Sequence, residues 1–167
     1  MKKGIAILIA VFAVIGIIIG IISGSYNGLV NQQEEVENKH SVISVQLQRR
    51  ADLIPNFVNT VKGYSDYEQK TYTAVTEARN AVAGAKTAGE QTKAAEQLDS
   101  AISVWVNAVT EAYPDLKANE NYKALQVELE GSENRIAVAR KDYNDAAKSY
   151  NSSVRRFPKN IIAGMFG

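Results

Sequence analysis

The sequence predicts an all-α protein in which an N-terminal transmembrane helix continues into an antiparallel four-helix bundle. An uncharged, apolar run fills residues 4–22. Apolar residues then recur at alternating spacings of three and four, the pattern of packed helices. Only three prolines interrupt stretches rich in Ala, Glu, Gln, Lys and Leu, and no run alternates as a strand would. We expect residues 1–25 to form the anchor, 26–158 the bundle and 159–167 an apolar, basic tail.

The anchor is predicted from the length of its apolar run. Residues 4–22 provide about the 20 residues that a helix needs to cross a hydrocarbon core of about 30 Å. A cleaved signal peptide is the competing interpretation, but its apolar part typically has only about 7–15 residues. Lys2 and Lys3 precede the run, whereas Glu34 and Glu35 are the first charges after it. The positive-inside tendency therefore predicts a single-pass protein of the cell membrane with a cytoplasmic N-terminus and an extracytoplasmic bundle.

Small residues repeat along one face of this predicted span. Gly16, Gly20 and Gly24 are spaced by four, which places them on one side of a helix. Such a stripe lets two helix backbones approach closely in a bilayer, so it predicts a homo-oligomer formed through the transmembrane helix. The alternative is that glycine is simply frequent in membrane helices.

Proline and glycine signals divide the predicted bundle. We expect the first helix to end near Asp52, which would cap a second helix with Pro55 in its first turn. The second helix should end before a small, flexible segment at residues 84–89, and the third at Tyr113, because a residue before proline disfavours helical geometry. The fourth should continue to Phe157. Expected core positions include Leu47, Arg50 and Ile54 in the first helix, Phe57 and Val61 in the second, Trp105 in the third and Tyr122 in the fourth.

Composition limits the chemistry that the chain can perform. The 19 basic and 18 acidic residues nearly balance, which argues against nucleic acid as a partner. The sequence has no cysteine, which excludes thiolate catalysis, cysteine metal sites and disulfides. It has one histidine and none of the paired Glu and Glu-x-x-His spacing of di-metal bundles. We therefore expect no enzymatic activity, no cofactor and no metal site.

Seven segments, in order, carry a resemblance to a known family. They are residues 26–30 (YNGLV), 46–56 (QLQRRADLIPN), 61–64 (VKGY), 111–121 (EAYPDLKANEN), 130–136 (EGSENRI), 150–151 (YN) and 157–158 (FP). With them the chain resembles the LemA family of bacterial membrane proteins over nearly its whole length. The resemblance implies a membrane anchor and an extracytoplasmic bundle, and it implies no particular biochemical activity. His40, Ser44 and Tyr67 stand where the family commonly has tryptophan, aspartate and histidine.

The two longest of these segments fall at the predicted turns between helices one and two and between helices three and four. Both turns should lie at the end of the bundle away from the membrane. Their polar and aromatic residues form a candidate partner-binding tip, which consists of Arg49, Arg50, Asp52, Asn56, Tyr113, Asp115, Lys117 and Asn119. The structural alternative is that Asp52 and Asn119 cap helices while Arg50 bridges to Asp115.

A second candidate site is a buried polar pair. His40 and Glu68 occupy core positions at similar predicted heights on helices one and two. A buried imidazole bonded to a carboxylate titrates near neutral pH and would suit a sensor. The simpler interpretation is a satisfied polar contact in the core.

The C-terminal tail also has two interpretations. Arg155, Arg156 and Lys159 alternate with apolar residues, so the tail suits the lipid interface with its bases toward headgroups, or it packs on the bundle or frays.

Together these patterns predict a non-enzymatic, membrane-anchored structural or adaptor protein that presents its bundle to an unidentified envelope protein. The alternative function is an extracytoplasmic ligand or pH sensor that uses the core around His40 and Glu68.

Overall fold

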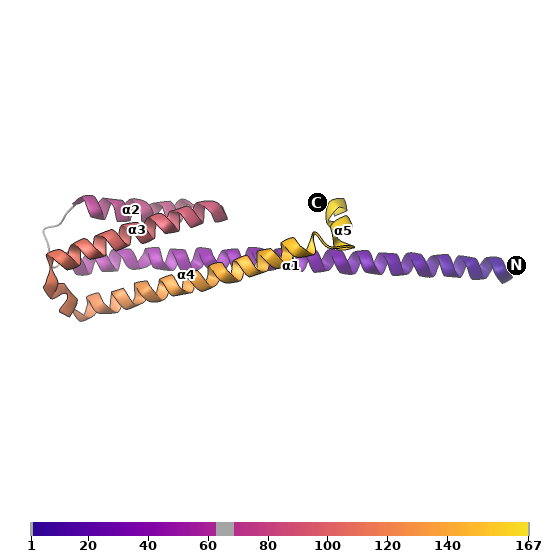
Figure 1. Cartoon of the computed structure of the whole chain (residues 1–167), viewed down its shortest axis with the longest axis horizontal. Coiled ribbons are helices and arrows are strands. Elements are labelled where there is room, and N and C mark those ends of the chain that lie inside the picture. The colour runs from indigo at the N-terminus through magenta and orange to yellow at the C-terminus, as the bar shows by residue number, and fades with distance from the viewer. Residues whose placement is uncertain (1, 63–68, 167) are drawn as a thin grey trace. The chain divides into compact units, whose positions relative to one another are not determined.

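The computed structural model describes residues 2–62 and 69–166, and every element in those ranges is helical (Figure 1). The elements are α1 (Lys2–Lys62), α2 (Gln69–Gly84), α3 (Ala88–Ala112), the 3₁₀ helix η1 (Pro114–Ala118), α4 (Glu120–Ser153) and α5 (Lys159–Phe166). The all-α class is thus confirmed for the described residues. The chain divides into two compact units, one of Met1–Lys39 with Asp142–Gly167 and one of His40–Lys141.

Helix α1 passes through the position at which the sequence predicted a break. It includes Pro55 and ends at Lys62, so the predicted start of a second helix was wrong. Asp52 does not cap a helix, because its Oδ1 accepts a hydrogen bond of 2.9 Å from Nε2 of Gln48, one turn earlier. The predicted positions of Gly63 and Tyr64 lie outside the described residues.

Arg79 compensates for the proline inside α1. Proline has no N–H, so the carbonyl of Ala51, four residues earlier, lacks its usual helical donor. Nε of Arg79 on α2 donates to that carbonyl oxygen at 3.2 Å. The link ties α2 to α1 at the residue where the backbone ladder is incomplete.

We expect Arg79→Met to lower the free energy of unfolding by about 1 kcal/mol, since a buried carbonyl loses a charged donor. In a Pro55→Ala background the loss should be smaller, because the restored N–H bonds to Ala51. Urea unfolding of the four variants measures both values, with Arg49→Met as the control at an exposed arginine. Equal losses in the two backgrounds would contradict this account.

The connection between α2 and α3 is a short, capped turn. Residues 84, 88 and 89 of the predicted flexible segment at 84–89 belong to the helices, and only residues 85–87 lie between them. Oγ1 of Thr87 accepts from the backbone N–H of Glu90 at 3.2 Å, and Oε2 of Glu90 accepts from the N–H groups of Lys86 and Thr87. These two bonds, from Lys86 first, lower the pKa of the Glu90 carboxyl below its ordinary value. A complete capping box therefore starts α3.

The connection between α3 and α4 matches the prediction. Helix α3 ends at Ala112, and Tyr113 before Pro114 has non-helical angles (φ −132°, ψ 77°). In η1, Leu116 is fully buried and anchors the turn. Oδ1 of Asn119 accepts from the backbone N–H of Tyr122 at 3.0 Å, so Asn119 caps α4 as expected.

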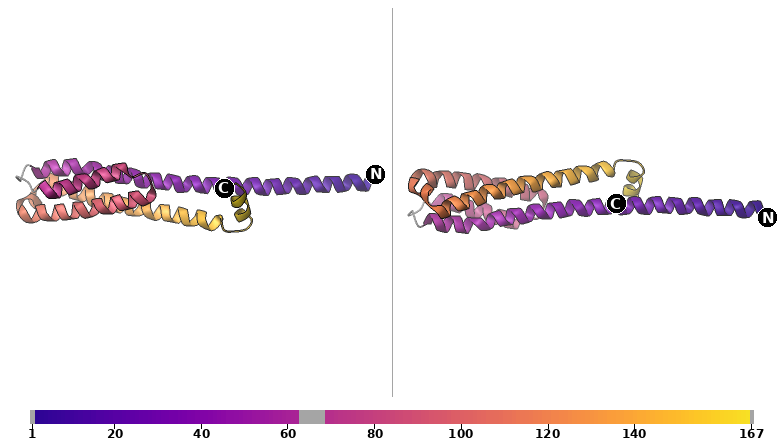
Figure 2. Two further views of the ribbon diagram at one scale, coloured as in Figure 1. Left: turned by 90° about the horizontal axis from the view of Figure 1, so that it is seen from above. Right: turned by 90° about the horizontal axis from the view of Figure 1, so that it is seen from below.

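The core of residues 40–141 is centred on three aromatic rings. The Phe57 centroid lies 5.0 Å from that of Trp105 and 5.1 Å from that of Tyr122, and all three side chains are buried. Two side chains also link α1 to its neighbours: Ser44 bonds to Gln91, and Arg50 pairs with Asp99 and Glu133. From Ser44 to Phe57 along α1, the contacted residues of α3 have increasing residue numbers, from 91 to 105. From Arg50 to Phe57, the contacted residues of α4 have decreasing residue numbers, from 133 to 122. The same helices are seen side by side in Figure 2.

The other unit contains the apolar part of α1. Among the described residues, one helix is long and apolar enough to cross a membrane, and none of its most apolar window is buried. In the same unit Nζ of Lys39 on α1 pairs with Asp142 on α4 at 3.5 Å. Helix α5 contacts α1 at Tyr26, whose ring centroid lies 5.1 Å from that of Phe166.

Candidate functional site

The glycine stripe lies on the exposed apolar part of α1. Gly16, Gly20 and Gly24 are all helical and exposed. A Cβ atom built at any of the three has no heavy atom within 4 Å, apart from the neighbouring backbone of the helix itself. Within the described part of the chain, this face of α1 is therefore open to another helix.

Most residues of the predicted tip reach the surface, but they do not all flank turns. Arg49, Arg50, Asp52 and Asn56 lie on the last turns of α1, and the other four members lie in or beside η1. The contact of Phe57 with Tyr122 places the end of α1 against the start of α4, which η1 precedes. The exposed members are Arg49, Asp52, Asn56, Asp115 and Lys117, and the half-buried members are Tyr113 and Asn119.

Arg50 is not part of an exposed surface. Its residue exposure is 4%, and its Nη1 lies 2.6 Å from Oδ1 of Asp99 while its Nη2 lies 4.0 Å from Oε2 of Glu133. The considered bridge to Asp115 is thus replaced by an ion cluster with α3 and α4. The reason is its place in the apolar spacing, since Arg50 falls between the core residues Leu47 and Ile54.

The sequence reasoning missed the two carboxylates of this cluster. Asp99 follows the buried Leu98, and Glu133 follows the buried Ser132, so both carboxylates flank core positions. An arginine at a core position requires such neighbours, because its charge persists at any physiological pH. Acidic residues next to the core positions of α3 and α4 were the available signal.

Burial raises the pKa of the Asp99 carboxyl above its ordinary value of 3.8, and the charge of Glu133 adds to this, while Arg50 opposes it. Folding therefore favours the protonated form, so this group's contribution to stability increases as pH falls through its folded-state pKa toward 3.8. We expect the free-energy difference between the unsubstituted chain and Asp99→Asn to shift in favour of the unsubstituted chain on acidification. Urea unfolding at several pH values measures the difference, in which the titration of Glu90 cancels. The opposite trend would show that the charge of Arg50 outweighs burial.

The predicted pair of His40 and Glu68 has one member outside the described residues. His40 is half-buried on α1, and its backbone carbonyl accepts from Oγ of Ser44 at 3.3 Å. The polar contact that the structure places nearby joins Ser44 to the buried Gln91, whose Nε2 donates to Oγ at 2.8 Å. It fixes α3 against α1, and the sequence did not indicate it.

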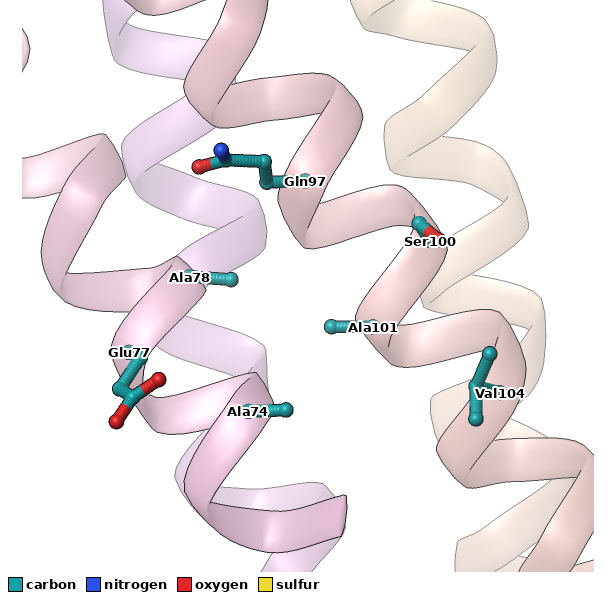
Figure 3. A pocket seen from close by; sticks show the side chains of 7 residues that line it. All are labelled: Ala74, Glu77, Ala78, Gln97, Ser100, Ala101 and Val104. Carbon is teal, nitrogen blue, oxygen red and sulfur yellow. The ribbon is translucent and has the colours of Figure 1, made fainter. Parts of the chain in front are cut away.

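A groove of about 500 Å³ lies between α2 and α3. Figure 3 shows Ala74 and Ala78 of α2 pointing toward it opposite Ala101 of α3. Its other lining residues are Glu77, Gln97, Ser100 and Val104. Four of these seven side chains are short and apolar, and the charged group among them is the carboxylate of Glu77. Across the ranges 2–62 and 69–166, no three His, Asp or Glu side chains gather as a metal site would require.

Comparison with known proteins assigns the chain to a protein family. The model of the LemA family matches residues 39–167, which is most of the chain. The protein named LemA of Metamycoplasma hominis is 31% identical, with 82% of this chain and 63% of that protein covered.

Magnetosome proteins also resemble the chain. MamQ 2 of Paramagnetospirillum magneticum is 27% identical and MamQ of Magnetospirillum gryphiswaldense 24% identical, each covering 85% of this chain and 61% of the relative. The chain thus spans somewhat less than two thirds of the length of these relatives.

Proposed function

We propose, from the premise that this chain belongs to the LemA family, that it is a membrane-anchored, non-enzymatic structural or adaptor protein. The apolar part of α1 crosses the cell membrane once, with the N-terminus in the cytoplasm and the remaining helices outside. Copies associate through the span and present the helical domain to another envelope protein.

The observation that carries this proposal is the exposure of the apolar part of α1. Large side chains such as Ile9, Phe12 and Ile17 are mostly exposed there, over a run of about the 20 residues that a bilayer core requires. In water so large an apolar surface is unfavourable, whereas lipid chains cover it without cost. The preceding Lys2 and Lys3 give the direction of insertion.

The exposed domain is proposed to be an antiparallel four-helix bundle formed by residues 40–141. The order of contacts along α1 supports this, since the residue numbers of its contact partners increase on α3 and decrease on α4. Short connections between helices favour the same topology. Its partner surface is the exposed part of the tip, namely Arg49, Asp52, Asn56, Asp115 and Lys117, together with the half-buried Tyr113 and Asn119.

Association between copies is assigned to the glycine stripe. Gly20 lies at its centre, and a leucine there would hold two backbones apart while keeping the span apolar. The carboxylates and bases of the exposed domain nearly balance and supply no evident code for self-association.

One experiment in native membranes tests anchoring and assembly together. Protease added to intact spheroplasts should remove the exposed domain, and crosslinking of the full chain should give oligomers that decrease in Gly20→Leu but not in Ile18→Leu, on the opposite face. Full protection from protease would overturn the orientation. An unchanged oligomer distribution in Gly20→Leu would overturn assembly through the stripe. Proteins crosslinked through the tip identify the envelope partner.

A further inference from the structure

Helix α5 packs at the end of the apolar span, within the same compact unit. Its residue Phe166 contacts Tyr26, and Nζ of Lys159 lies 3.7 Å from a Cβ built at Gly28. Tyr26 follows the last apolar residue of the span, Ile22, by four positions, or about 6 Å along the helix. In a chain whose span crosses a bilayer, this is the depth of the headgroups.

The orientation of α5 suits that depth. In Figures 1 and 2 the short helix, drawn in yellow, crosses the axis of α1 and does not run along it. A helix that runs across a transmembrane helix, and not along it, lies close to the plane of the membrane. Amphipathic helices at membrane surfaces take the same orientation, with the apolar face at the boundary of the acyl chains.

The apolar side chains of α5 divide between an inner and an outer face. Ile162 is 4% exposed and holds the helix to its own unit, whereas Met165 is 67% exposed. Ile161, one helical turn before Met165, is exposed as well, as are Phe157 ahead of the helix and Phe166 at its end. So much exposed apolar surface on an eight-residue helix is unfavourable in water and indicates that this face binds another apolar surface.

The charges beside this apolar surface have one sign. Arg155 and Arg156 are exposed just before α5, and Lys159 begins it. Residues 151–167 contain no Asp or Glu, so these three bases have no acidic neighbour in their own segment. Each base close to an anionic membrane surface adds to the attraction between the segment and that surface.

We propose that α5 is an interfacial helix, which inserts Ile161, Met165 and Phe166 among the acyl chains and directs Arg155 and Arg156 to anionic phospholipid headgroups. The inference rests on the proposed function, because it takes α1 to cross the same bilayer. The occupant of the exposed face is thus the membrane surface. The exposed face of α5 lies beside the end of the span, and this position favours the membrane surface over a protein partner as its occupant.

Spin labels in the full-length chain test this placement, since the sequence contains no cysteine to compete with an introduced one. Met165→Cys probes α5, Ile15→Cys probes the span, and Val138→Cys, exposed on α4, is the aqueous control. The labelled protein is reconstituted in vesicles of phosphatidylcholine, with or without phosphatidylglycerol. Collision rates with oxygen and with a water-soluble nickel complex report the depth of each label.

The expected result is a label at 165 with several-fold higher preference for oxygen than the label at 138, at a depth shallower than that at 15. A water-like label at 165 beside a lipid-like label at 15 would overturn the interfacial helix while the anchor stands. A water-like label at 15 would overturn the anchor itself. Spin–spin broadening at 165 that persists in Gly20→Leu, where association through the span is weakened, would show that a second copy covers α5, which also overturns the proposal.

The role of the arginines is tested in the same vesicles. Arg155→Gln with Arg156→Gln should make the label at 165 shallower in vesicles that contain phosphatidylglycerol and leave it unchanged in phosphatidylcholine alone. The same change in both vesicles, or in neither, would overturn the assignment of these bases to anionic headgroups.

Discussion

Phe57→Ala is expected to lower the free energy of unfolding by about 3–5 kcal/mol, the usual cost of deleting a buried ring. Phe57 is fully buried between Trp105 and Tyr122, so its removal leaves a cavity and breaks two aromatic contacts. Trp105 is the only tryptophan in the sequence, and its fluorescence reports unfolding at the site of the change. Urea titration of the full chain in detergent gives the value.

The matched control is Val127→Ala on α4, where the side chain is largely exposed. Its effect should stay within about 0.5 kcal/mol, as for most surface substitutions. A Phe57→Ala variant that unfolds at the same urea concentration as this control would contradict the described core.

The double substitution Asp99→Asn with Glu133→Gln is expected to destabilise the chain more than either substitution alone, because only the double change leaves the buried guanidinium of Arg50 without a counter-charge. The cluster is asymmetric: the side chain of Arg50 is 5% exposed, while those of Asp99 and Glu133 are 37% and 65% exposed. Removing the arginine is therefore less costly, since water can solvate the two carboxylates. We expect Arg50→Met to cost less than about 1 kcal/mol.

Combining the three substitutions separates charge from packing. The variant with all three changes should resemble Arg50→Met, because no buried charge remains in it. Urea unfolding of the single, double and triple variants completes the cycle. If Arg50→Met proves more destabilising than the double substitution, the carboxylates and not the guanidinium are the groups that depend on the cluster.

Much of the core was predictable because apolar spacing survives errors in the helix boundaries. Ile54, Phe57 and Val61 are all buried, as the sequence predicted, although the prediction divided them between two helices. Their spacing of three and four continues without interruption across Pro55, and that continuity indicated one helix. The prediction gave the proline more weight than the spacing. The missing information was that Arg79 donates a hydrogen bond to the carbonyl of Ala51, from which it is 28 positions away along the chain.

The candidate site was less predictable because its members differ in burial. Neighbouring arginines at 49 and 50 have the same chemistry, yet one is exposed and the other lies in the core, since adjacent helical positions face different directions. The pairing of Arg50 with Asp99 and Glu133 depends on how α1, α3 and α4 align, which spacing within one helix does not specify. Local signals, such as the capping by Asn119, were read correctly.

The hydrogen bond from Arg79 to the carbonyl of Ala51 also restricts how α2 can slide along α1. Apolar ridges on two helices tolerate displacement by one turn, about 5.4 Å, because similar side chains then face each other. Along an uninterrupted helix every carbonyl is satisfied, and no position differs from the next. The proline creates one acceptor that differs from the rest, and only one alignment brings the guanidinium of Arg79 to it. The missing backbone hydrogen bond at Pro55 thus selects one alignment of α2 on α1 among several alignments with similar apolar contacts.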